Sequence, residues 1–112
     1  MNEILCIFDS YKTVYMFLIE IVKQINSIGL EIERVDRKKF CIKCGGWEII
    51  CTSVNGSNPG VSRDRVKYFY KELWLGDSNR AFDEGIKYTL PPWAEEIKDR
   101  HTLVKILAGE LR

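Results

Sequence analysis

The sequence has little of several things that would point directly to a function. Its 112 residues include one histidine and three prolines, and 17 basic residues stand against 16 acidic ones. The resulting charge of +1 gives no overall positive field of the kind that marks most nucleic-acid-binding proteins. The few prolines and the 46% hydrophobic content exclude a disordered or fibrous chain. The length fits one domain, residues 1–112.

Long apolar runs are also missing. The longest one, from Val14 to Ile19, is six residues long and is followed by Glu20, whereas a membrane-spanning helix needs about 20. The first residues lack the basic stretch and the cleavage site of a secretory signal. We therefore expect a cytoplasmic protein with no membrane partner and with four reduced cysteines. The 13 isoleucines and three alanines are typical of AT-rich coding, which favours a low-GC bacterium or its phage.

Apolar spacing predicts a strand and then a helix at the start of the chain. Residues 3–8 are rich in β-formers and lead into Asp9-Ser10, which are both good helix N-caps. One long helix from the N-terminus is the alternative, because the same residues also fit helical spacing. A helix is expected from Tyr11 to Ile28, with Gly29 as the left-handed residue after its end. Its predicted buried stripe consists of Val14, Leu18, Ile21, Val22, Ile25 and Ile28.

Residues 30–54 predict a three-stranded antiparallel meander, with strands over residues 30–35, 39–44 and 47–54. Gly45-Gly46 is read as a two-residue hairpin loop, which fixes the register of the last two strands. The predicted cross-strand pairs are Lys43 with Glu48, Ile42 with Ile49, Cys41 with Ile50, and Phe40 with Cys51. The face expected to lie on the helix carries Phe40, Ile42, Cys44, Trp47, Ile49 and Cys51.

Helical spacing dominates the second half of the chain. We expect a helix that begins at Ser62 and ends before Gly76, with a strand over residues 66–70 as the alternative. A short helix capped by Asp77-Ser78 should follow and contain Ala81, Phe82 and Ile86. Pro92 should open the last helix, with Ile97, Val104, Leu107 and Leu111 on its inner side. The predicted fold is therefore α+β: an antiparallel meander sheet of three to four strands, packed by an N-terminal helix and C-terminal helices.

The motifs that carry chemistry are incomplete. Cys41-Ile42-Lys43-Cys44 is half of a zinc knuckle, but the chain has no second pair with this spacing. In a regular strand the two cysteines would also point to opposite faces. A zinc site around Cys41 and Cys44 is therefore the third hypothesis, behind buried free thiols.

Catalytic signatures are no more complete. Lys12-Thr13 matches the end of a phosphate-binding loop, but Cys6 and Tyr11 stand where that motif requires glycines. His101 is the single histidine, so no Ser-His-Asp order can be proposed. We expect a protein that is not an enzyme and that holds no cofactor.

A basic segment supports the second hypothesis, an anion receptor. A helix starting at Ser62 would aim free backbone amides at residues 55–62, although Asp64 could satisfy those amides instead. The partner would be a nucleic acid or a phosphate-bearing small molecule. The candidate ligand-binding residues are Asn55, Gly56, Gly60, Ser62, Arg63, Arg65 and Lys67, and Lys71 continues the basic line of Arg63 and Lys67. A second basic cluster consists of Arg34, Arg37, Lys38, Lys39 and Lys43.

Aromatic side chains support the main hypothesis. They make up 12% of the chain, and Trp, Tyr and Arg dominate the energetic hot spots of protein interfaces. The predicted interface residues are Trp47, Tyr70, Trp74 and Trp93. We expect a small non-enzymatic binding protein that acts through protein–protein contacts, with another protein or with a second copy of itself as a homo-oligomer.

Overall fold

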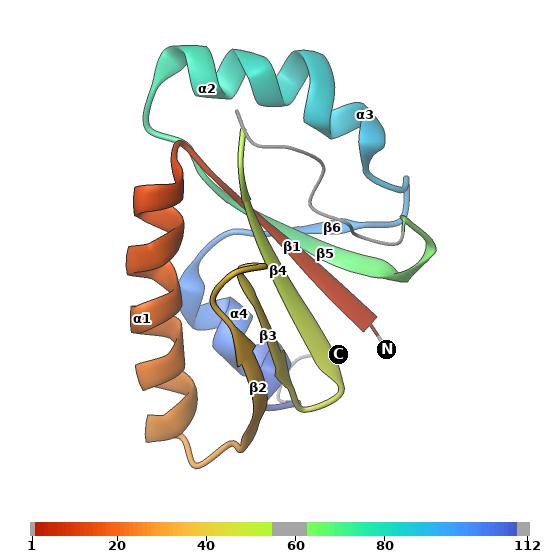
Figure 1. Cartoon of the computed structure of the whole chain (residues 1–112). Helices are drawn as coiled ribbons and strands as arrows, with labels where there is room; N and C mark the ends of the chain where they lie inside the picture. Colours follow the sequence, from red (N-terminus) through yellow and green to blue (C-terminus); the bar gives the residue numbers. More distant parts are fainter. Residues whose placement is uncertain (1, 55–62, 110–112) are drawn as a thin grey trace.

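The computed structural model describes residues 2–54 and 63–109, which form one mixed β-sheet with helices on both faces (Figure 1). The strands are β1 (Asn2–Phe8), β2 (Ile32–Asp36), β3 (Cys41–Cys44), β4 (Trp47–Ser53), β5 (Val66–Glu72) and β6 (Glu95–Ile97). Within the described residues the order across the sheet is β2-β3-β4-β1-β5-β6. β1 runs parallel to β4 and β5, and β5 to β6, whereas β3 is antiparallel to both of its neighbours.

Helices cover both faces of the sheet. They are α1 (Tyr11–Ser27), α2 (Gly76–Ala81), α3 (Lys87–Thr89) and α4 (Arg100–Leu107), with a π-helical turn η2 (Phe82–Ile86) between α2 and α3 and a 3-10 turn η1 (Arg63–Arg65) before β5. α1 and α4 lie on one face, and the stretch from α2 to α3 lies on the other (Figure 1). The expected α+β class is confirmed, but the sheet is mixed and has six strands in the described residues, so the meander is only half of it.

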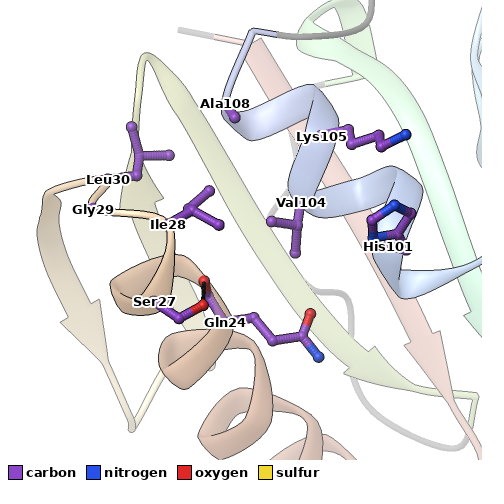
Figure 2. A pocket seen from close by; sticks show the side chains of 9 residues that line it. All are labelled: Gln24, Ser27, Ile28, Gly29, Leu30, His101, Val104, Lys105 and Ala108. Atoms are coloured by element: carbon purple, nitrogen blue, oxygen red, sulfur yellow. Dashed lines mark hydrogen bonds between the residues drawn. The ribbon is translucent and has the colours of Figure 1, made fainter.

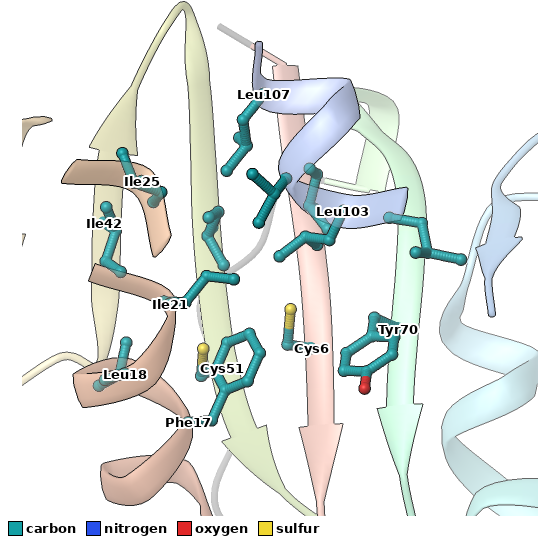
Figure 3. Packing of buried hydrophobic residues seen from close by; sticks show 14 of the residues in the cluster. Cys6, Phe17, Leu18, Ile21, Ile25, Ile42, Cys51, Tyr70, Leu103 and Leu107 are labelled. Atoms are coloured by element: carbon teal, nitrogen blue, oxygen red, sulfur yellow. The ribbon is translucent and has the colours of Figure 1, made fainter. Parts of the chain in front are cut away.

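Two hydrophobic cores lie on opposite faces of the sheet, and β1 contributes to both. Ile4, Cys6 and Phe8 belong to the larger core under α1 and α4, whereas Leu5 and Ile7 belong to the smaller core under η2. Figure 3 shows the larger core, in which α1 side chains such as Phe17, Ile21 and Ile25 point toward the sheet. A central parallel strand buried on both faces reads as a continuous apolar run, which is what residues 4–8 provide.

The meander and its register are confirmed. Gly45 and Gly46 have φ angles of 59° and 82°, which suit a hairpin turn that needs positive φ at both central residues. Lys43 pairs with Glu48, and the pairs that follow are Ile42 with Ile49 and Cys41 with Ile50, as predicted. The predicted Phe40–Cys51 pair lies just beyond β3, where the Cys51 amide donates to the Phe40 carbonyl at 2.9 Å.

The predicted helix from Ser62 is wrong, because Val66–Glu72 forms strand β5 beside β1. Tyr70 faces the larger core, whereas Phe69 packs against the smaller one. Since β5 buries side chains on both faces, apolar residues occur at odd and even positions and imitate helical spacing. The alternative prediction, a strand over residues 66–70, is confirmed by β5. Gly76 begins α2 instead of ending a helix, and Ser62 lies outside the described residues.

The last predicted helix begins too early. Residues 95–97 form β6, which pairs with β5 and buries Ile97 opposite Tyr70. The helix starts at Arg100, because Asp99 is its N-cap and accepts the Thr102 amide at 2.7 Å. The first predicted strand is confirmed as β1, but it joins the sheet in parallel between β4 and β5.

Candidate interaction face

Several of the exposed large apolar side chains of the described residues lie on α1 and the neighbouring edge strand β2. We define the α1–β2 face as the exposed side chains of Tyr11, Tyr15, Met16, Ile19 and Val35. Met16 is 61% and Ile19 is 53% exposed. Both are large apolar residues in the middle of a regular helix.

The sequence of α1 explains why this surface remains. The helix buries Val14, Phe17, Leu18, Ile21 and Ile25 against the sheet. At about 100° per residue, the apolar positions from Phe17 round to Met16 span an arc of about 260°, whereas covering a core takes an arc of about 100°. One side of α1 therefore satisfies the fold, and Tyr15, Met16 and Ile19 face outward on a side that also carries Lys12 and Lys23.

A groove runs between α1 and β2 at this face. It has a volume of about 330 Å³, and its walls are almost entirely apolar apart from Lys23 and Arg37. The lining residues are Tyr15, Leu18, Ile19, Val22, Lys23, Val35 and Arg37. At the amino-terminal end of α1, the ring of Phe40 lies 5.1 Å from that of Tyr11 and 5.8 Å from that of Tyr15, measured between centroids. These contacts fix two of the exposed tyrosines in place.

β2 forms one edge of the sheet. One side of the strand pairs with β3, and no strand of the described residues pairs with its other side. The pairing with β3 shifts between Ile32 and Arg34, so that Glu33 is an extra residue in the ladder. An edge strand offers unpaired backbone groups to any chain that comes alongside.

The second basic cluster lies around the turn that follows β2. Arg34 pairs with Asp36 at 3.1 Å, and the amides of Lys38 and Lys39 each donate to Asp36 at 3.0 Å. These contacts, the Lys39 amide foremost, lower the pKa of Asp36. Lys43 faces Glu48 at 3.8 Å. Of the five basic residues in this cluster, Arg37 lines the apolar groove between α1 and β2.

A charged cluster that the sequence analysis missed lies where β5 ends. Arg100 donates to both oxygens of Glu72, from Nε at 2.5 Å and from Nη2 at 2.8 Å, and the Tyr70 hydroxyl also donates to Glu72. Burial acts to raise the pKa of Glu72, but the bonds from Arg100 and Tyr70 outweigh it, and the pKa is lowered. Burial and the contact with Glu72 raise the pKa of Tyr70. A shallow pocket of about 420 Å³ lies beside this cluster.

Asp9 forms a second closed cluster at the same end of the sheet. Its carboxylate accepts the amides of Trp74 at 2.9 Å and Leu75 at 3.5 Å. Burial acts to raise the pKa of Asp9, but these bonds and one from Ser78 lower it overall. The predicted N-cap role belongs to Ser10, which accepts the Thr13 amide. Asp9 instead connects β1 to the segment that follows β5.

The predicted interface aromatics do not form one surface. Tyr70 is buried, and Trp47 is half-buried with its ring 5.6 Å from that of Tyr68. Trp93 donates from Nε1 to the carbonyl of Val66 at the start of β5, whereas Trp74 follows the end of that strand. Trp74 is 78% exposed. β5 spans about 20 Å, so it separates Trp93 from Trp74.

The predicted anion-binding residues are only partly described. Asn55, Gly56, Gly60 and Ser62 lie outside the described residues, and Arg63 lies in η1. The side chains of Arg65 and Lys67 are exposed at the start of β5. Lys71, which continues the predicted basic line, lies over the ring of Phe82 at 4.4 Å.

The two cysteines of the predicted zinc site point to opposite faces of the sheet. Cys44 belongs to the larger core, whereas Cys41 packs against the smaller one. Burial raises the pKa of both thiols. Across residues 2–54 and 63–109, no group of three or more His, Cys, Asp or Glu side chains is placed to hold a metal ion.

A larger pocket of about 580 Å³ lies between the end of α1 and α4 (Figure 2). His101 and Lys105 line it from α4, and Gln24 and Ser27 line it from α1 (Figure 2). The Ser27 hydroxyl donates to the Gln24 carbonyl at 2.8 Å, so its proton is not directed at His101. The Ser27 hydroxyl and the His101 imidazole are therefore not paired as the nucleophile and base of covalent catalysis would be.

No family model, curated protein or solved structure matches this chain. Among the described residues, none of the helices has the length and apolar character needed to cross a membrane. The α1–β2 face combines exposed apolar side chains, an apolar groove and a sheet edge.

Proposed function

We propose that the protein is a non-catalytic interaction protein that associates with a second copy of itself through the α1–β2 face. The observation that carries this proposal is the exposure of large apolar side chains on α1 directly beside an open sheet edge. Contiguous apolar surface of this kind marks protein interaction sites on soluble domains.

Self-association is favoured over other partners because two identical copies can share both features of this face. The apolar side chains of α1 can pack against the same side chains of a second copy, and the open sheet edge can lie beside the same edge. A two-fold interface buries the same patch on each copy, so one set of apolar residues and one free edge are enough. The non-catalytic part of the proposal is supported by the charged clusters, since Asp9 and Glu72 are both engaged in internal hydrogen bonds.

Sedimentation equilibrium of the wild-type protein and of Ile19→Glu tests the proposal. Ile19 is exposed in the middle of α1, so a glutamate there leaves the fold intact but would be buried without a partner in the dimer. The wild type should form dimers, and the variant should be monomeric over the same concentrations.

Tyr88→Glu is the matched control. Tyr88 is 76% exposed and lies on α3, on the other side of the sheet, so this variant should associate like the wild type. A wild-type protein that is still monomeric at about 1 mM, where an association free energy of about −4 kcal/mol would already be visible, overturns the proposal.

A further inference from the structure

The chain leaves the parallel strands β1, β5 and β6 on alternating faces of the sheet. All three strands end at the same edge. α1 follows β1 onto the larger core, the stretch from α2 to α3 follows β5 onto the smaller core, and α4 follows β6 onto the larger core (Figure 1). Where the connections of neighbouring parallel strands part to opposite faces, they leave a crevice outside the carboxyl ends of the strands, and open sheets bind ligands there. β5 and β6 form such a point.

The shallow pocket of about 420 Å³ lies at this point. Its walls are residues 70–74, at the end of β5, and residues 98–100, which connect β6 to α4. Small-molecule sites have volumes of about 300–1,000 Å³, so the pocket is large enough for a ligand. The topology of the sheet and the cavity therefore indicate the same place.

Trp74 gives this pocket an exposed aromatic residue. It has the largest exposed fraction, 78%, among the large apolar residues that the structure describes. Its backbone amide donates to the carboxylate of Asp9, which follows β1, at 2.9 Å. The segment that carries Trp74 is thus fixed before a ligand arrives, which reduces the entropic cost of binding. Exposed indoles provide a flat surface on which any nucleobase can stack.

Arg100 is fixed beside the same pocket. Its Nε and Nη2 donate to Glu72, and its guanidinium lies over the ring of Phe17 at 5.1 Å. A guanidinium has five N–H donors, so donors remain after these two bonds and after the contact with the Tyr70 hydroxyl. The side chain is 31% exposed. Donors that are held in one geometry suit the oxygens of a phosphate.

The charges around the pocket can accept an anion. The Glu72 carboxylate is matched by Arg100, and the Asp99 carboxylate accepts the Thr102 amide as the N-cap of α4. Lys98 pairs with Glu96 at the surface and is 77% exposed. Such a pair contributes little, so the Lys98 ammonium is available to a ligand.

We infer that this pocket binds a mononucleotide, with the base stacked on Trp74 and the phosphate held by Lys98 and Arg100. A nucleotide combines the two groups that these side chains recognise, a flat ring and an oxyanion. The inference does not depend on the association of two copies, because the pocket and the α1–β2 face share no residue.

An NMR titration of the wild-type protein with adenosine monophosphate tests the inference. The indole N–H signal of Trp74, assigned by its loss in Trp74→Leu, should shift with a dissociation constant of about 1 mM or less. The indole signals of Trp47 and Trp93 should stay in place, since neither residue lines the pocket.

Three further probes separate the two recognised groups. Adenosine lacks the phosphate, and inorganic phosphate lacks the ring, so each should bind at least about tenfold more weakly than adenosine monophosphate. Phenylacetate has a ring and a carboxylate but no ribose or phosphate, and it should also bind at least about tenfold more weakly.

Exposed positions provide the variants, so the fold is retained. Trp74→Leu removes the stacking surface and should weaken the binding of adenosine monophosphate about tenfold. Lys98→Ala should weaken it about threefold and leave adenosine binding unchanged. Tyr88→Leu is the matched control, because Tyr88 is 76% exposed on α3, away from the pocket, and it should bind like the wild type.

Four results would overturn the inference. The first is an unshifted Trp74 signal at about 10 mM adenosine monophosphate, and the second is equal affinity of Trp74→Leu and the wild type. The third is inorganic phosphate binding as tightly as the nucleotide, which would show that the ring is not recognised. The fourth is phenylacetate binding as tightly, which would assign the pocket to aromatic carboxylates instead.

Discussion

The cluster around Glu72 and the α1–β2 face differ in how completely their side chains are satisfied within one chain. At the end of β5, the Glu72 carboxylate accepts from Arg100 and Tyr70, so a largely buried charge is paired within one chain. On α1, Ile19 and Met16 remain more than half exposed although they are apolar. A carboxylate paired inside the chain makes the fold sensitive to the loss of its partner, whereas uncovered apolar surface marks a site of binding.

This difference predicts where substitutions will act. Changes in the Glu72 cluster should alter the free energy of unfolding of each copy and leave association alone when the chain stays folded. Changes on the α1–β2 face should do the reverse.

Arg100→Ala should have the largest effect. It leaves the Glu72 carboxylate, whose side chain is 12% exposed, without its cation, and breaking a largely buried pair in this way costs about 3 kcal/mol of stability. Urea denaturation measures the loss. Lys98→Ala is the control, because its pair with Glu96 is at the surface with Lys98 77% exposed, and it should cost less than about 0.5 kcal/mol.

Asp9→Asn should have an intermediate effect. The substitution removes the charge that strengthens the hydrogen bonds from the Trp74 and Leu75 amides, and the expected loss is about 1.5 kcal/mol. The fluorescence of exposed Trp74 reports on whether the segment after β5 keeps its conformation. Unchanged stability would mean that this segment does not depend on Asp9.

The pH dependence of stability should follow from the same carboxylates. The pKa of Glu72 is lowered in the folded chain, because its bonds from Arg100 and Tyr70 outweigh the effect of burial. Its contribution is therefore complete above the unfolded-state pKa of about 4.3 and is lost as the pH falls through the folded-state value. Denaturation between about pH 5 and pH 2.5 should show a shallower decline for Glu72→Gln than for the wild type. Parallel curves would contradict the pairing.

Ile19→Ser should have the smallest effect on each copy. Since half of this side chain is already exposed in the folded chain, the monomer should lose less than about 1 kcal/mol. Thermal denaturation at concentrations too low for association isolates this value. A larger loss would show that Ile19 belongs to the core, and the contrast between the two regions would disappear.

The local parts of this fold could be predicted from the sequence. The Gly45-Gly46 hairpin has its register because two adjacent glycines accept positive φ, which is a property of those residues alone. Gly29 likewise ends the first helix with a φ of 76°. These features need no knowledge of the rest of the chain.

The tertiary parts could not be predicted in the same way. β5 is a strand because it pairs with β1 from a distant part of the sequence, and its burial on both faces hides the alternation that marks a strand. Glu72 and Arg100 are 28 residues apart, and the spacing of charges along the chain does not reveal such a pair. The exposed side of α1 was not predicted either. The way the helix packs on the sheet decides which of its apolar residues are buried and which remain exposed.

The most direct test of this account is the sedimentation equilibrium of the wild type beside Ile19→Glu and Tyr88→Glu. The account predicts a dimer for the wild type and for Tyr88→Glu, and a folded monomer for Ile19→Glu. A folded Ile19→Glu protein that dimerises as strongly as the wild type would contradict it.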